Sequence, residues 1–294
     1  FNAVDIIVVG RFSGSQSLAA VGSTTALINV FTNLFIGISL GANVLAARYY
    51  ALEKSKEMSE TVHTAIAFAL ISGVGMAVIG LLMAKPALEL MGTPDDVIAK
   101  STLYMRIYFC GMPFFMLYNY GAAILRAVGD TKRPLIFLLI SGVINAILNL
   151  FLVIQFHLDV AGVGIATVIS QLISCILVLR CLYCSESSYQ FRPGKLNIRS
   201  RYLRQIFEVG IPAGIQSTVI NLSNAMLQSS VNSFGSISMA GYTAANNIFG
   251  FLYVSVNSVT QACMSFTSQN YGVKKLKRMD RVLIDCAILS VVVA

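Results

Sequence analysis

Long apolar runs dominate this chain and constrain its fold more than any other feature. Seven complete runs lie near residues 21–47, 62–84, 101–125, 134–156, 160–184, 206–234 and 239–268, and partial runs occupy 1–12 and the stretch after Arg281. A helix needs about 20 apolar residues to cross a bilayer, so each complete run is long enough to span one. The runs are continuous rather than alternating, which favours helices over a β-barrel.

Charged residues are too scarce for a soluble protein. They make up 12% of the 294 residues, whereas soluble domains carry about 25%. So few charges cannot cover a surface that faces water. The composition argues against soluble enzymes, secreted disulfide scaffolds, disordered chains and nucleic-acid-binding domains, and it predicts an all-α polytopic membrane protein.

The basic residues are concentrated in alternate loops. Of the 21 Lys and Arg residues, 17 lie near 48–56, 126–133, 180–204 and 274–281. The excess of positive charge on cytoplasmic loops then predicts a multi-pass protein of the plasma (inner) membrane, with these loops in the cytoplasm. Because the charge is spread over four loops, the net charge of +8 indicates topology and no nucleic-acid partner.

The chain also repeats itself at an offset of 221–222 residues. Asn2-Ala3 aligns with Asn224-Ala225, Phe12 with Phe234, and the basic stretch 52–56 with 273–277. An offset of six spans keeps the same orientation, which predicts two lobes related by a parallel six-helix repeat. We expect a nearly complete N-lobe at 1–184, a cytoplasmic linker at 185–205 and a truncated C-lobe at 206–294 with spans 7, 8 and part of 9. The first residue is not Met and the last run is short, so we expect a fragment of a protein with about twelve spans.

Several motifs, taken in order, resemble the multidrug and toxic compound extrusion (MATE) family. They are Phe1 to Gly10 followed by Ser17-Leu18-Ala19-Ala20-Val21-Gly22, the loop Ile124 to Pro134, Ala161 to Thr167, and Gly210-Ile211-Pro212. The polar pattern is most similar to the prokaryotic DinF-like branch. The resemblance covers the whole chain. It implies a secondary antiporter that exports amphipathic or cationic compounds in exchange for H⁺ or Na⁺ by alternating access.

Asp5 is the candidate coupling residue. It lies inside the first apolar run, where an ionised carboxylate is costly and an acid is a functional candidate by default. It could instead be exposed at the helix end or paired with Arg11. In the resembled family an acid at this position couples ions, so the resemblance implies the same role for Asp5.

Amides surround this candidate in the predicted bundle. Asn145 and Asn149 are one helical turn apart and face the same way, so they could hydrogen-bond Asp5 or hold helices together. The resemblance adds Thr167 and Asn119 to the ion-coupling set. The family branch has an acid where this chain has Asn149, and an amide cannot take up a proton. A single carboxylate could serve H⁺ or Na⁺. The resemblance favours H⁺, because the sodium-coupled NorM-like branch of the family has a carboxylate in span seven and residues 211–234 of this chain contain no acid.

Further polar and soft side chains could line a central substrate cleft or simply pack between helices. The candidates for the cleft are Asn29, Asn33, Met116, Asn221, Asn257 and Gln261. His63 and His157 lie at a helix start and in an outer loop, and we expect both to be solvated. Cys181 and Cys184 form a lone pair without a nearby His, so no metal site is predicted.

Other functions fit the sequence less well than export does. A flippase for lipid-linked saccharides would need a deep basic cavity, yet Arg106 is the only cation within a span away from the basic loops. A membrane enzyme would need paired acidic motifs or His-Glu-x-x-His, and the chain offers only the acidic turn at 93–96. A receptor or channel would not explain the repeat. We therefore expect no enzyme and no cofactor besides the coupling ion, with a small-molecule substrate, the lipid bilayer as surroundings and function as a monomer.

Overall fold

The chain folds into long helices joined by short loops. The computed structural model describes residues 2–90, 93, 95–232 and 236–293, and these residues contain no strand. The helices are α1 (Asn2–Phe12), α2 (Ser15–Ala51), α3 (Ser55–Leu90), α4 (Asp95–Cys110), α5 (Met112–Ala127), α6 (Lys132–Leu150), α7 (Asp159–Tyr183), α8 (Ser200–Asn232), α9 (Ser236–Gly272) and α10 (Leu276–Val293). A π-helical turn, Phe151–Gln155, extends α6, and a 3₁₀ turn, Pro193–Lys195, lies in the linker.

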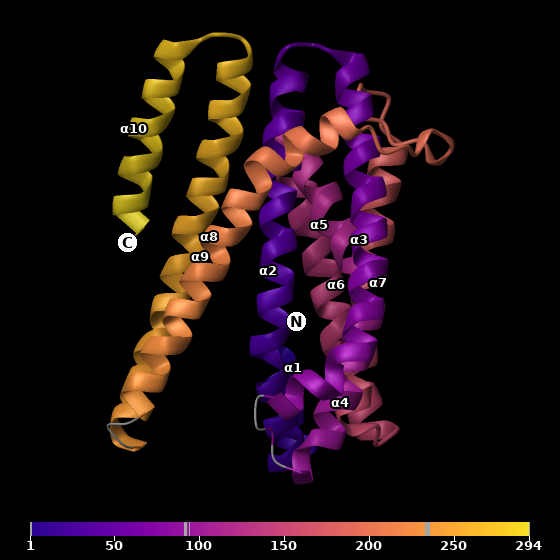
Figure 1. Ribbon diagram of the computed structural model, residues 1–294, viewed down its shortest axis with the longest axis vertical. Coiled ribbons are helices and arrows are strands. Elements are labelled where there is room, and N and C mark those ends of the chain that lie inside the picture. The colour runs from indigo at the N-terminus through magenta and orange to yellow at the C-terminus, as the bar shows by residue number, and fades with distance from the viewer. Residues whose placement is uncertain (1, 91–92, 94, 233–235, 294) are drawn as a thin grey trace.

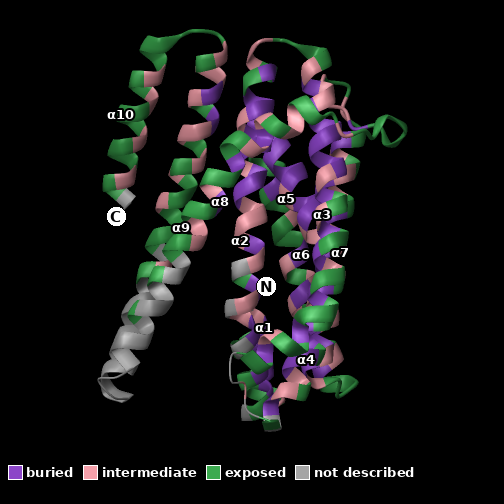
Figure 2. Cartoon of the chain, viewed as in Figure 1, coloured by how far each residue is buried: buried purple, intermediate pink, exposed green. Residues whose placement is uncertain are grey.

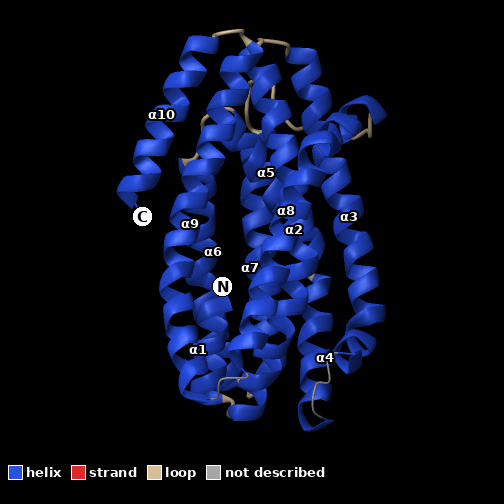
Figure 3. Cartoon of the chain, turned by 60° about the vertical axis from the view of Figure 1, so that its left-hand side comes forward, coloured by secondary structure: helices blue, strands red, loops and turns tan. Residues whose placement is uncertain are grey.

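The long helices run roughly along one axis (Figures 1 and 3), and Figure 1 shows them in two groups. Helices α1–α7 pack around a shared core, and α8–α10 lie beside them. The loops 52–54 and 273–275 lie at the same end of the molecule, at the top of Figure 1, and we call this the basic end. The architecture is the all-α fold in two groups that the sequence predicts.

Burial follows the surroundings expected of membrane helices. Buried residues concentrate on α2, α3 and α5, whereas the outward faces of α3 and α6 are exposed (Figure 2). Those outward faces are apolar, with Leu82 71% and Leu139 60% exposed. Large apolar side chains on an outer surface are suited to contact with lipid rather than water. Four described helical stretches are long and apolar enough to cross a membrane, namely Gln16–Ala51, Ser55–Leu90, Lys132–Gln155 and Asp159–Tyr183.

The span predicted at 101–125 is wrong as a single helix. Helix α4 ends at Cys110 and α5 begins at Met112, so two helices of 16 residues each replace it. Pro113 lacks a backbone N–H and cannot continue the hydrogen-bond ladder, but it is well suited to the start of a new helix. At the break, the N–H of Gly111 donates to the carbonyl of Tyr108 at 2.9 Å in a tight turn.

The internal repeat is confirmed by the helix boundaries. Helices α2 and α9 both have 37 residues and begin 221 positions apart. The loops that follow match as well, because Glu53 (φ 54°) and Lys274 (φ 56°) share a left-handed backbone. The N–H of Lys54 donates to the Tyr49 carbonyl at 3.1 Å, and that of Lys275 donates to the Asn270 carbonyl at 3.0 Å. The same local structure therefore occurs twice.

The two groups join over the half of α2 that is nearer the basic end. Gly210 of α8 packs so closely on α2 that a Cβ there would lie 2.6 Å from the Ile38 Cα. On α9, the Ser268 hydroxyl donates to the Val44 carbonyl at 2.6 Å. Away from this end, α8 and α9 lean away from α2 (Figure 1). The junction described here is therefore one-sided.

The segment between the two groups folds over the start of α3. His63 is only 3% exposed, and its Nε2 accepts the N–H of Arg192 at 3.1 Å. Its Nδ1 lies 2.6 Å from the Ser59 carbonyl oxygen, which can only accept, so Nδ1 carries the proton. The expectation of a solvated His63 is therefore wrong, because the linker covers it, whereas His157 is exposed. Helix α8 begins at Ser200, inside the linker expected at 185–205.

Candidate functional site

Asp5 lies at the meeting point of three helices. Its side chain, on α1, is 1% exposed. Asn149 on α6 donates through Nδ2 to Oδ1 of Asp5 at 2.7 Å. Thr167 on α7 donates through its hydroxyl to Oδ2 at 3.0 Å. Each carboxylate oxygen thus accepts one hydrogen bond from a different helix.

Asn145 completes the network around the carboxylate. Its Nδ2 donates to the Thr167 hydroxyl oxygen at 3.3 Å, and its Oδ1 accepts from Nδ2 of Asn149 at the same distance. Asn145 and Asn149 are fully buried. The structure therefore brings together four of the five residues expected around the coupling ion, and we call Asp5, Asn145, Asn149 and Thr167 the Asp5 network.

The Asp5 network contains no positive charge. Among the described residues, no Lys, Arg or His lies within ion-pair distance of Asp5, and Arg11 is exposed. Pairing with Arg11, one of the alternatives at the sequence level, therefore does not occur. One acceptor remains free, because Oδ1 of Asn149 is buried and has no partner among the described residues. A buried carboxylate beside a free acceptor is an unusual and costly combination.

A small cavity opens next to the carboxylate. Its volume is about 180 Å³, and it is lined by Asp5, Thr25, Ile28, Asn29, Tyr104, Tyr108, Phe115, Thr167 and Gln171. The sequence reasoning missed Tyr104, Tyr108 and Gln171. Helical spacing could have found them, because Tyr104 and Tyr108 are one turn apart and Gln171 lies one turn after Thr167.

Two expected residues lie elsewhere. Asn119 donates through Nδ2 to the carbonyl of Phe115 in its own helix at 2.8 Å, and no described hydrogen bond joins it to the Asp5 network. Met116 is fully buried in the core of the α1–α7 group, so its assignment to a substrate cleft is wrong for this conformation. The reason is that α5 is central and surrounded, with contacts to α2, α3 and α7.

The remaining cleft candidates do not share one cavity. Asn29 lines the cavity beside Asp5, and Asn33 is half-buried one turn further along α2. Asn257 is exposed on α9, and Gln261 lines a separate cavity at the basic end. The side chain of Asn221 lies outside the described residues. The single central cleft therefore remains a prediction.

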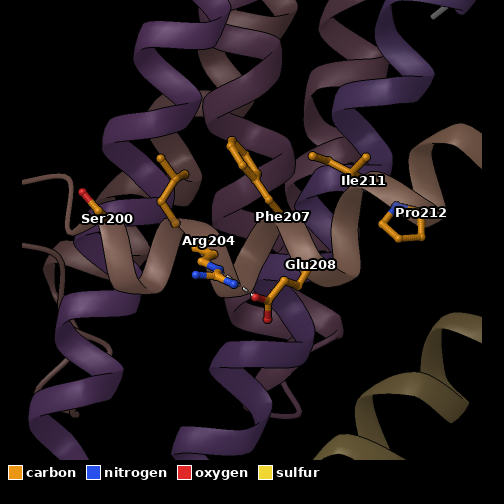
Figure 4. A pocket seen from close by; sticks show the side chains of 7 residues that line it. Ser200, Arg204, Phe207, Glu208, Ile211 and Pro212 are labelled. Atoms are coloured by element: carbon orange, nitrogen blue, oxygen red, sulfur yellow. Dashed lines mark hydrogen bonds and ion pairs between the residues drawn. The ribbon is translucent and has the colours of Figure 1, made fainter.

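A hollow of about 480 Å³ along α8 has fewer polar groups available to a ligand than the cavity beside Asp5. Figure 4 shows its polar side chains beside apolar Phe207, Ile211 and Pro212. Arg204 and Glu208 pair with each other at 3.0 Å, which leaves neither charge free for a ligand. Among the described residues, no group of three or more His, Cys, Asp and Glu side chains could hold a metal.

Comparison with known proteins adds to this geometry. A family model described as MatE matches residues 1–151 and 212–294. A relative from Bacillus subtilis (strain 168), the "Probable multidrug resistance protein YoeA", is 31% identical over 287 residues, which cover 95% of this chain and 62% of that protein. A "FAD transporter" from Shewanella oneidensis is 21% identical, with 97% and 64% covered. The chain thus spans less than two thirds of the length of these relatives.

A solved structure shares the fold. The crystal structure of MATE in the bent conformation superposes with a TM-score of 0.90 at 20% sequence identity, over 99% of this chain and 65% of that one. The helix arrangement described above is therefore one already seen in experimental structures.

Proposed function

Because the chain belongs to the MatE family, we propose that it serves in a secondary active antiporter of the plasma (inner) membrane. The antiporter exports amphipathic or cationic organic compounds, and an inward flux of H⁺ drives the export. The basic loops face the cytoplasm, and the protein works as a monomer. The observation that carries the proposal is the buried Asp5 carboxylate, which has two hydrogen-bond donors and no cationic partner among the described residues.

This arrangement suits a carboxylate that binds a proton and then releases it. The ionised form of Asp5 accepts hydrogen bonds from Asn149 and Thr167, which compensate in part for its removal from water. The neutral form needs an acceptor for its own O–H group, and the free Oδ1 of Asn149 lies on the side chain already bonded to Asp5. Both forms can therefore be accommodated with small movements.

We infer proton coupling over sodium coupling, because a proton needs only one carboxylate oxygen, whereas Na⁺ keeps its charge and needs several oxygen ligands. Asp5 is the only carboxylate in the network, and its other members are two amides and one hydroxyl. A single carboxylate bound to one proton becomes neutral, which is the cheapest state in a membrane interior. Na⁺ would use the same oxygens and is the alternative that the experiment must separate.

Alternating access needs a junction that can open. In the proposal, the contacts of α8 and α9 with α2 at the basic end close the inner side, and separation of these contacts opens it. The exported compound and the proton then use the same internal space at different times. The wall of the cavity beside Asp5, with Tyr104, Tyr108 and Phe115, offers aromatic surface suited to an organic cation.

The test is transport by the full-length protein in proteoliposomes. Efflux of a fluorescent organic cation should follow an imposed pH gradient in the wild type and be lost in Asp5→Asn. A response of the wild type to a Na⁺ gradient alone would move the coupling to Na⁺. Gradient-driven transport that persists in Asp5→Asn would overturn the role of Asp5.

A second candidate function is the export of a larger anionic or lipid-like molecule. It includes the flippase for lipid-linked saccharides considered from sequence, and the relative named as an FAD transporter favours keeping it. The cavity beside Asp5 does not favour it, because no described basic residue lines that cavity. The same liposomes, loaded with FAD, separate the two candidates.

A further inference from the structure

One ammonium group joins three helices at the end of the molecule opposite the basic end (Figure 1). Nζ of Lys100, on α4, lies 2.7 Å from Oδ2 of Asp159, the first residue of α7. The same Nζ donates to the Ser17 hydroxyl on α2 at 2.8 Å. Ser17 is fully buried, whereas the side chains of Lys100 and Asp159 are 36% and 31% exposed. We call these three residues the Lys100 tie.

The helices that the Lys100 tie joins also form most of the wall of the cavity beside Asp5. Of the nine residues that line this cavity, seven lie on α2, α4 and α7. In each of these helices, one lining residue lies eight positions after the member of the tie. The pairs are Ser17 with Thr25, Lys100 with Tyr108, and Asp159 with Thr167. Eight residues of helix span about 12 Å, so the tie and the cavity wall are two layers of the same three helices.

The start of α7 has a backbone that needs support from its surroundings. Asp159 has a φ of 50°, in the left-handed region that residues other than glycine rarely adopt. Such a conformation persists only where neighbouring groups hold it. The ion pair with Lys100 supplies one such contact. Its loss would free the first turn of α7 to relax, and α7 would shift against α4.

The Lys100 tie also connects the two elements that bring Asp5 and Thr167 together. Two residues separate α1, which carries Asp5, from α2, and Ser17 lies in the first turn of α2. Asp159 begins α7, which carries Thr167. The hydrogen bond of 3.0 Å between Thr167 and Asp5 therefore spans two elements whose ends are fixed by the same ammonium group.

We propose that Lys100 is a positioning residue for the site at Asp5. It holds α2, α4 and α7 together on one side of the cavity, and so it sets the distance between the aromatic wall at Tyr104 and Tyr108 and the Asp5 carboxylate. The inference rests on the proposed function, which places the exported organic cation in this cavity. Lys100 does not line the cavity, so it acts on the bound cation through the helices.

The experiment measures export of a fluorescent organic cation by the full-length protein in proteoliposomes, at a fixed pH gradient and over a range of cation concentrations. Lys100→Gln should raise KM about tenfold and leave kcat within about twofold, because a cavity of poorer fit loses binding energy. Asp159→Asn should have the same effect. The double variant should be no worse than either single variant, because both changes remove one contact. Lys100→Arg keeps the charge and should stay within about threefold of the wild-type KM.

Lys85→Gln is the matched control. It removes a lysine from another ion pair, with Glu89 at 3.7 Å on α3, and neither residue lines the cavity. Its KM should equal that of the wild type. Partial misfolding would lower the amount of active protein and the maximal rate and would leave KM unchanged, so KM separates positioning from folding. An unchanged KM in Lys100→Gln, or an equal rise in Lys85→Gln, would overturn the role of Lys100.

Binding of the same cation in detergent, without a gradient, separates this inference from the proposed function. If the wild type binds the cation and a pH gradient does not drive its export, the proposed function is wrong. The inference then still requires that Lys100→Gln bind the cation about tenfold more weakly than the wild type. Equal Kd values for these two proteins would overturn it. A wild type that does not bind the cation would overturn both.

Discussion

At the scale of single residues, the Asp5 network is held by very few atoms. Thr167 donates to Asp5 and at the same time accepts from Asn145 at 3.3 Å, so one hydroxyl links α1, α6 and α7. A hydrogen bond to a charged group contributes about 1.5–3 kcal/mol. The loss of this hydroxyl therefore affects both the carboxylate and the amide behind it.

Thr167→Val tests this link, because it keeps the shape of the side chain and removes the hydroxyl. We expect proton-driven transport in proteoliposomes to fall about tenfold, as the loss of one such hydrogen bond implies. Thr167→Ser keeps the hydroxyl and should stay within about twofold of the wild type. Equal rates for the Val and Ser variants would show that the hydroxyl has no part in coupling.

The site could be predicted from the sequence only at residues whose type or spacing is unusual for an apolar helix. Asp5 is an acid in an apolar run, and Asn145 and Asn149 have a regular spacing, so their convergence could be predicted. Met116 and Asn119 could not be placed, because the face that a helix buries depends on packing against other helices. Arg126 looked like a loop cation, and only the folded chain shows it at a cavity.

At the scale of helices, the crossing of α2 and α8 depends on glycine. A Cβ at Gly210 would lie 2.6 Å from the Ile38 Cα, and one at Gly214 would lie 2.7 Å from the Leu34 carbonyl oxygen. Both neighbours are backbone atoms, which cannot rotate away. The close approach of α8 to α2 therefore requires residues without a side chain.

Gly210→Ala should force α8 away from α2. We expect a destabilisation of about 1–3 kcal/mol, in the range for overpacked sites, measured as a lower thermal unfolding temperature in detergent. Gly75→Ala on α3 is the control, because a Cβ there meets nothing within 4 Å. It should be neutral or slightly stabilising, since Ala favours helix more than Gly does. Similar losses in both variants would contradict a specific contact.

Helix positions were predictable from hydropathy, and helix continuity was not. The internal repeat predicts that α2 and α9 start and end at equivalent positions, because the aligned segments include the loop before and the loop after each helix. The break at Gly111 was missed, although Gly111-Met112-Pro113 carries the signal of a helix start. A hydropathy average does not detect this helix start, because the residues before and after Gly111 are equally apolar.

At the scale of the whole molecule, the one-sided junction defines what must move. In the proposed cycle, α9 separates from α2 at the basic end, where Ser268 bonds to the Val44 carbonyl. The α1–α7 group moves as a unit, since its helices share one core. Motion should therefore be blocked by a link across the junction and not by a link within the group.

A pair of disulfides distinguishes these cases in a background without the native cysteines. Val44→Cys with Ser268→Cys joins α2 to α9, and its oxidation should abolish transport until a reductant is added. Ser141→Cys with Ser174→Cys joins α6 to α7, whose two hydroxyls lie 2.7 Å apart, and should leave transport unchanged. Transport that survives the first cross-link would show that the junction does not open.

The central claim is that Asp5 exchanges a proton for the exported compound, and proton release measures this directly. A fluorescent organic cation is added to the purified full-length protein in a weakly buffered solution with a pH dye. By linkage, the wild type should release about one proton for each cation bound. Asp280→Asn, which changes an exposed carboxylate on α10, should behave like the wild type. Asp5→Asn should release none, and release equal to that of the wild type would contradict the account.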